Sequence, residues 1–206
     1  MGNLRSVEKG CKKVGLNVIV TNSPEDVEAA DAIILPGVGA FRDCMEELRR
    51  LNLVETIINS IKHGKPYLGI CLGLQILFKE SEEFGLYRGL GIIEGRVIRF
   101  PHNELKVPHM GWNSIKIVRR NQLLEGIEDG SYFYFVHSYY VKPENEDVVS
   151  TTTEYGITFT SMIHRDNIFA VQFHPEKSQT LGLKMLYNYG KYVESLKDGQ
   201  NNRVDR

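Results

Sequence analysis

Residues 67–75 read Tyr67-Leu68-Gly69-Ile70-Cys71-Leu72-Gly73-Leu74-Gln75, with a cysteine between two glycines where an apolar strand is expected to give way to a helix. This is the Gly-x-nucleophile-x-Gly elbow, with sulfur in place of the serine hydroxyl. The tight turn lifts the side chain of Cys71 out of the sheet. It also leaves the thiol at the N-terminus of a helix predicted to run to about Phe78, where the helix dipole favours the thiolate. The stretch therefore predicts a nucleophilic cysteine within an α/β fold.

Strands and helices alternate on both sides of the elbow. We expect helices over residues 3–14, 24–30 and 41–63, the last broken near Asn52, and strands over 16–20 and 31–35. This alternation argues for an open, mostly parallel sheet flanked by helices on both faces. Later strands are expected over 95–100, 113–118, 131–141, 148–153, 157–163 and 168–173, and they add an antiparallel sheet region. A last helix is predicted over 178–196.

The whole chain of 206 residues suits a single α/β domain over residues 1–196, followed by a polar tail over 197–206 that we expect to be disordered. A net charge of −1 gives no reason to expect a nucleic-acid or membrane partner. No apolar run approaches the ~18 residues of a membrane span, and no signal peptide opens the chain. The three cysteines are scattered without zinc-like spacing, so a reduced, cytoplasmic setting is the simplest expectation.

A histidine and a glutamate lie two residues apart where the strand over 168–173 ends, in His174-Pro175-Glu176. Proline holds the residue before it in an extended conformation, in which residues i and i+2 point to the same side. The carboxylate can then reach one imidazole nitrogen while the other faces a thiol, as in a nucleophile–base–acid triad. Alone, Cys71 would be interpreted as a small buried residue and the histidine and glutamate as a surface pair. Together they predict a catalytic triad.

The segment Pro36-Gly37-Val38-Gly39-Ala40-Phe41 joins a buried strand to a helix, and its glycines can turn backbone amides inward, as an oxyanion hole requires. Such loops also bind phosphates or serve only as turns. Two histidines, His109 and His137, lie in aromatic, strand-like segments and could equally be core residues or line a site. Cys11 and Cys44 are interpreted as packing residues.

These segments together resemble the class I, or triad, glutamine amidotransferases. Gly69-Ile70-Cys71-Leu72-Gly73 and Phe173-His174-Pro175-Glu176 carry the resemblance to that superfamily. Within it, the loop over 36–41 and the segments over 108–113, 134–139 and 174–178 look like those of the glutaminase subunits of imidazole glycerol phosphate synthase. The resemblance covers residues 2–196.

The resemblance implies that Cys71, His174 and Glu176 hydrolyse glutamine through a thioester, without a cofactor or a metal. It implies oxyanion-hole amides at Leu72, Val38 and Gly39, and glutamine-binding positions at Gly37, Gln75, Glu83, Ser138 and Tyr139. It also implies a partner, the cyclase subunit, which is a (β/α)8 barrel that forms a heterodimer with the glutaminase and receives its ammonia. The products there are imidazole glycerol phosphate and an aminoimidazole carboxamide ribonucleotide (AICAR). Asn3, Ser6 and Tyr134 match interface positions.

The chain departs from the family pattern at its start. Family members typically begin with a hydrophobic strand followed by Asp-Tyr-Gly-Met-Gly-Asn, whereas here Met1-Gly2-Asn3-Leu4 resembles only the end of that motif. We therefore expect the first strand to be missing, which should leave an unpaired edge in the sheet.

Three other functions compete with this interpretation. One is the glutaminase of another synthase, such as pyridoxal phosphate synthase, although that family prefers a Pro-Gly-Gly-Glu-Ser loop. A second is a cysteine hydrolase that acts alone on γ-glutamyl or peptide bonds. The third is a catalytically silent binding subunit, because the N-terminus departs from the pattern.

Overall fold

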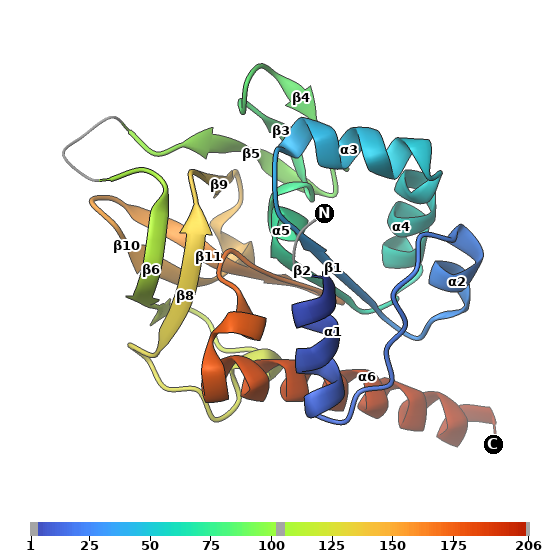
Figure 1. Cartoon of the computed structure of the whole chain (residues 1–206). Coiled ribbons are helices and arrows are strands. Elements are labelled where there is room, and N and C mark those ends of the chain that lie inside the picture. The colour runs from blue at the N-terminus through green and yellow to red at the C-terminus, as the bar shows by residue number, and fades with distance from the viewer. Residues whose placement is uncertain (1–3, 102–105, 205–206) are drawn as a thin grey trace.

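The computed structural model describes residues 4–101 and 106–204, and side chains as far as residue 198. Within that part of the chain, a ten-stranded sheet has the order β1-β2-β12-β11-β9-β5-β3-β4, with β10 paired to β11 and β7 (Figure 1). A separate two-stranded sheet pairs β6, His109–Ser114, with β8, Tyr132–His137. No helix in the described residues is long and apolar enough to cross a membrane.

The parallel part of the sheet consists of β1 (Ile33–Gly37), β2 (Tyr67–Cys71) and β12 (Ile168–Val171). Every residue of β2 and β12 is buried, as is usual for parallel strands covered on both faces. Gly37 lies in register with Cys71, and Val171 with Ile70. The carboxyl ends of the three strands, and the loops that follow them, therefore meet at one edge of the sheet.

The remaining strands extend this sheet mostly by antiparallel pairing. They are β3 (Phe78–Ser81), β4 (Tyr87–Arg88), β5 (Ile93–Arg99), β7 (Lys116–Ile117), β9 (Tyr139–Pro143), β10 (Val149–Glu154) and β11 (Thr158–Arg165). The α/β class and its antiparallel addition are confirmed. The parallel pairs are β1–β2, β2–β12 and β3–β5, and the antiparallel region continues the same sheet.

Helices cover both faces of the parallel strands (Figure 1). On one face, α1 (Leu4–Lys13) and α6 (Gln179–Val204) pack on Leu68 and Ile70 of β2. On the other, α3 (Phe41–Arg50) and α4 (Leu53–Lys62) pack on Tyr67, with α2 (Pro24–Ala29) beside α4. Tyr67 thus enters one core and Leu68 and Ile70 the other, as the strand period of two requires, whereas Cys71 at the elbow joins the second core.

The predicted helices and their breaks are largely confirmed. Asn52 takes a left-handed conformation between α3 and α4, at the break that the sequence predicts. The last helix, expected to end at Leu196, continues to Val204. Three 3-10 helices complete the described elements: η1 (Gln122–Leu124), η2 (Glu146–Val148) and η3 (Pro175–Lys177).

Three local expectations are wrong. The single strand expected over 131–141 is divided into β8 and β9, which lie in different sheets. Residues 16–20 form no strand, and Ile19 and Val20 remain 67% and 52% exposed. A strand requires a neighbour for its backbone, and β1 itself lies at the end of the sheet order, with no earlier strand among the described residues. The helix after the elbow, α5, spans only Leu72–Gln75, because the chain has already entered β3 at Phe78.

Candidate active site

Cys71 occupies a strained elbow at the end of β2. Its backbone has φ 56° and ψ −104°, which side-chain-bearing residues rarely adopt. A Cβ on Gly69 would lie 2.5 Å from the carbonyl oxygen of Gly73, and one on Gly73 would collide with the carbonyl oxygen of Leu35. The hydroxyl of Tyr67, fully buried, donates to Gly73 O at 2.8 Å. Both glycines are therefore sterically required, and the predicted elbow is confirmed.

The short helix after the elbow changes the electrostatic expectation. One turn of helix carries a smaller dipole than the longer helix predicted from sequence. The thiol must therefore depend more on side chains around it.

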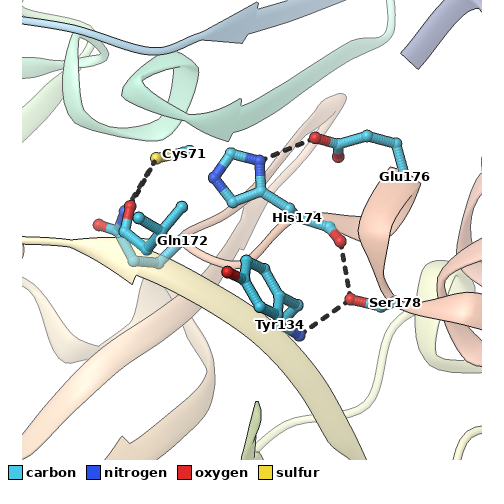
Figure 2. Close-up of polar contacts among 7 residues, drawn as sticks. Cys71, Tyr134, Gln172, His174, Glu176 and Ser178 are labelled. Carbon is cyan, nitrogen blue, oxygen red and sulfur yellow. Dashed lines mark hydrogen bonds and ion pairs between the residues drawn. The ribbon is translucent and has the colours of Figure 1, made fainter. Parts of the chain in front are cut away.

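His174 lies between Cys71 and Glu176 (Figure 2). Its Nδ1 is 2.8 Å from Oε1 of Glu176, and the two side chains are 2% and 1% exposed. The backbone of His174 is extended before Pro175, as predicted, and Glu176 follows within η3. The amide of His174 donates to Tyr134 O, and the hydroxyl of Ser178 donates to His174 O. Hydrogen bonds thus hold both the backbone of His174 and the Nδ1 atom of its ring.

The charge balance favours a protonated ring. Burial lowers the pKa of His174, but the Cys71 thiol and the Glu176 carboxylate outweigh it and raise that pKa to about 9. Nε2 is buried and makes no hydrogen bond of normal geometry within the described residues. The ring and the thiol therefore lie close enough for Cys71 to raise the pKa of His174.

The predicted oxyanion loop begins directly beside the elbow. A Cβ on Gly37 would lie 2.8 Å from Cβ of Leu72, so the loop and α5 are in close contact. Val38 is 38% exposed, and Gly39 has φ +101° with open space around it. At the far end of the loop, the amide of Phe41 donates to Oε2 of Glu83 at 2.6 Å. The loop therefore starts beside the elbow, with Gly37 in register with Cys71 and in contact with Leu72, and Val38 and Gly39 follow it.

The other predicted glutamine-binding residues lie near the same edge, in contact with one another or with the loop. Glu83 is half-buried, and burial raises the pKa of its carboxyl group. Ser138 O accepts the amide of Phe100, and Tyr139 O accepts Nε2 of Gln75 at 3.0 Å. Gln75 itself is only 6% exposed.

An aromatic surface lies beside His174 on the two-stranded sheet. It consists of Met110 (62% exposed), Trp112 (46% exposed) and Tyr134, with the rings of Trp112 and Tyr134 edge to face at 6.1 Å. Lys177 lies over the Tyr134 ring at 5.6 Å. Of the predicted interface residues, Tyr134 belongs to this surface and Ser6 lies half-buried in α1, whereas Asn3 falls outside the described residues.

Sequence reasoning missed one polar residue that contacts Cys71. Gln172 is fully buried, and its Nε2 donates to Sγ of Cys71 at 3.6 Å (Figure 2). The available signal was an uncharged polar residue within the apolar run 168–173, two positions before His174. His109 and His137 are both buried and bonded to each other, whereas Cys11 and Cys44 pack in the two cores, as predicted.

The structure brings together a cysteine at a strand-to-helix elbow and a buried His–Glu pair, as the sequence predicts. The family model described as glutamine amidotransferase class-I matches residues 1–191, and the chain belongs to that family. Solved structures agree on the fold: a glutamine amidotransferase (TM-score 0.71, 20% identity, 92% of this chain and 95% of the other) and a putative GMP synthase subunit from Thermoplasma acidophilum (TM-score 0.71, 21% identity, 97% and 93%).

Curated relatives are more specific. The imidazole glycerol phosphate synthase subunit HisH of Syntrophotalea carbinolica is 56% identical, over 92% of this chain and 95% of the relative. The HisH subunits of Aquifex aeolicus (52% identical, 95% and 95%) and Methanothermobacter thermautotrophicus (53% identical, 94% and 96%) are similarly close. Within the class I amidotransferases, the chain therefore belongs to the HisH family.

Proposed function

We propose that this chain is the glutaminase subunit of imidazole glycerol phosphate synthase, and that it hydrolyses glutamine to glutamate and ammonia with Cys71, His174 and Glu176. The observation that supports this most directly is the buried His174–Glu176 pair beside the strained Cys71. The choice of this synthase is supported by the HisH relatives, which match nearly the whole chain.

The raised pKa of His174 means that the ring carries a proton at neutral pH. The nucleophilic form of a cysteine is the thiolate. The Cys71 thiolate attacks the side-chain carbonyl carbon of glutamine, and the imidazolium of His174 gives its proton to the departing ammonia. Neutral His174 then takes a proton from water, which hydrolyses the γ-glutamyl thioester and releases glutamate. The Nδ1–Glu176 bond fixes the ring tautomer so that Nε2 performs both transfers.

The oxyanion of each tetrahedral intermediate would be held by the amide of Leu72 and by an amide of Val38 or Gly39. Gly39 has a backbone conformation that glycine adopts easily and no neighbour to restrict it, so this loop can reorient its amides. Removal of one oxyanion donor typically costs about 10²–10³ in rate. We propose that binding of the partner orients the amides of this loop toward the oxyanion. The glutamine would be bound by Gly37, Gln75, Glu83, Ser138 and Tyr139.

Ammonia must reach its acceptor without loss to solvent, which requires a partner against the site. We propose that the aromatic surface of Met110, Trp112 and Tyr134 docks on the cyclase subunit. Exposed aromatic residues next to a reactive site are typical anchors of a protein interface.

The test measures glutamine hydrolysis by the purified chain, alone and with the cyclase and the ribonucleotide substrate of that enzyme. Stimulation by the partner, together with loss of activity in Cys71→Ala, is the expected result. Activity that is indifferent to both the partner and the cysteine would refute the assignment. High turnover without a partner would instead favour a hydrolase that acts alone.

A further inference from the structure

A buried row of uncharged polar groups runs from Cys71 to β6. Nε2 of Gln172 is 3.6 Å from Cys71 Sγ, and Oε1 of Gln172 accepts Nε2 of Gln75 at 3.1 Å. The same Gln75 nitrogen donates to Tyr139 O, which also accepts Nδ1 of His137 at 2.8 Å. Nε2 of His137 is 3.0 Å from Nδ1 of His109, and Nε2 of His109 is 3.2 Å from Nδ2 of Asn113.

The direction of every bond in this row follows from two backbone carbonyls. Tyr139 O can only accept, so the Gln75 atom facing it must be nitrogen, and that nitrogen in turn requires an oxygen from Gln172. If the amide of Gln172 were reversed, two N–H groups would face each other in the protein interior. Gln172 must therefore present its N–H to the sulfur.

The histidine side of the row obeys the same logic. His137 donates from Nδ1 to Tyr139 O, so its Nε2 accepts from Nδ1 of His109. Nε2 of His109 then accepts from Asn113, whose nitrogen is fixed independently because it also donates to Glu154 O. Burial lowers the pKa of His109 to about 4 and that of His137 to about 3, so both rings stay neutral at physiological pH.

Aromatic packing keeps the row in place. The His109 ring is stacked between Phe135, at 4.9 Å, and Tyr155, at 4.0 Å between ring centroids. Gln172 is fully buried, and Gln75, His109 and His137 are at most 6% exposed. Reorientation of one member would leave a neighbour without its partner in the interior, which is costly.

The thiol has a different partner in each of its two forms. As a neutral group, Cys71 directs its proton toward Val136 O at 4.0 Å, whereas the thiolate can accept the N–H of Gln172. Cys71 is only 7% exposed, so a thiolate there has little access to water and needs a donor from the protein.

We propose that Gln172 is a further catalytic residue, whose amide N–H stabilises the Cys71 thiolate, and that Gln75, His137 and His109 are positioning residues that hold this amide in its donating orientation. The row ends at Asn113, next to Trp112 on the aromatic surface, so it also connects the thiol to the face where we place the partner. The inference deepens the proposed function, and it can be tested without glutamine.

The test compares Gln172→Met, which keeps the approximate volume but removes the donor, with the unaltered chain. The rate of Cys71 alkylation by iodoacetamide is measured against pH by mass spectrometry of the Cys71 peptide. A hydrogen bond to a charged group is worth roughly a tenfold change or more. We expect about tenfold slower alkylation at pH 7, a profile moved to higher pH, and an unchanged plateau at high pH. Gln172→Asn, which is too short to reach, should behave in the same way.

A matched control is Thr151→Val, which removes another buried hydrogen bond, to Ser161 at 2.8 Å, without touching the sulfur. It should leave the alkylation profile unchanged. His109→Phe, which keeps an aromatic ring between Phe135 and Tyr155, should slow alkylation a few-fold, but have no further effect in the Gln172→Met background.

Two results would overturn the inference: coincident profiles for Gln172→Met and the unaltered chain, or equal slowing by His109→Phe in both backgrounds. Glutamine hydrolysis by the same proteins is measured separately. A chain that needs Cys71 and its partner for hydrolysis, but shows coincident alkylation profiles, would refute only the role of Gln172. Hydrolysis indifferent to Cys71 and the partner would refute the proposed function, whatever the alkylation result.

Discussion

Replacement of Glu176 by glutamine removes one charge from a buried pair with little change in shape. In the unaltered chain the pKa of His174 is raised from 6.5 to about 9, which corresponds to roughly 3 kcal/mol in favour of the folded protein. The raised pKa means that this stabilisation is complete below about pH 6.5 and is lost as pH rises through about 9. In Glu176→Gln the burial that lowers the pKa of His174 remains, while one of the two groups that raise it is lost. The pKa of His174 should therefore fall.

The assay is urea unfolding of both proteins at intervals from pH 6 to pH 10. The unfolding free energy of the variant should lie up to about 3 kcal/mol below that of the unaltered chain at pH 6, and the gap should close above pH 9. Repetition in a Cys71→Ala background separates the contribution of the thiol from that of the carboxylate. Glutamine hydrolysis should fall on the order of 10³–10⁴-fold, because a glutamine N–H facing Nδ1 favours the wrong tautomer. A stability gap that stays constant across this pH range would refute the linkage argument.

Three further predictions concern the elbow and the partner surface. Gly73→Ala should destabilise the fold by about 3 kcal/mol or more, because its Cβ meets the backbone of β1, whereas Gly64→Ala, with φ +86° but open space, should cost only about 1–2 kcal/mol in urea unfolding. Tyr67→Phe leaves Gly73 O without its side-chain donor and should cost about 1–3 kcal/mol by the same measurement, and an unchanged midpoint would contradict that role. Trp112→Ala should weaken binding to the cyclase at least about tenfold by calorimetric titration, with a smaller effect from Met110→Ala, and equal affinities would place the interface elsewhere.

The parts of the site that could be predicted from sequence depend on local geometry. The elbow is recognised from five consecutive residues, and the need for glycine at position 69 is local, because a Cβ there would meet the carbonyl oxygen of Gly73. The need for glycine at position 73 comes from Leu35 of the adjacent strand β1. The His174–Glu176 contact follows from the extended residue before Pro175. The motif and the His174–Glu176 contact can be recognised without knowing which strands are neighbours, and the structure reproduces both.

The parts that could not be predicted depend on neighbours distant in sequence. Residues 16–20 have the composition of a strand, but β propensity reflects packing against adjacent strands, and no strand pairs with them here. The role of Gln172 requires Gln75, which is 97 residues away, and a carbonyl of β9. A single polar residue in an apolar run indicates a buried hydrogen bond, but it does not identify the residue that accepts or donates that bond.

Register in the parallel strands explains why these separate parts form one site. Gly37 faces Cys71 across the β1–β2 pair, and Val171 faces Ile70 across β2–β12. The loop after β1, Cys71 and the segment leading to His174 therefore leave the sheet side by side. A shift of one residue in either pair would turn every side chain of that strand to the opposite core. Leu68 and Ile70 would then face α3 and α4, and Tyr67 would leave the core that it shares with those helices. The tight packing on both faces of β2 therefore determines the position of Cys71 as strictly as the elbow glycines determine its conformation.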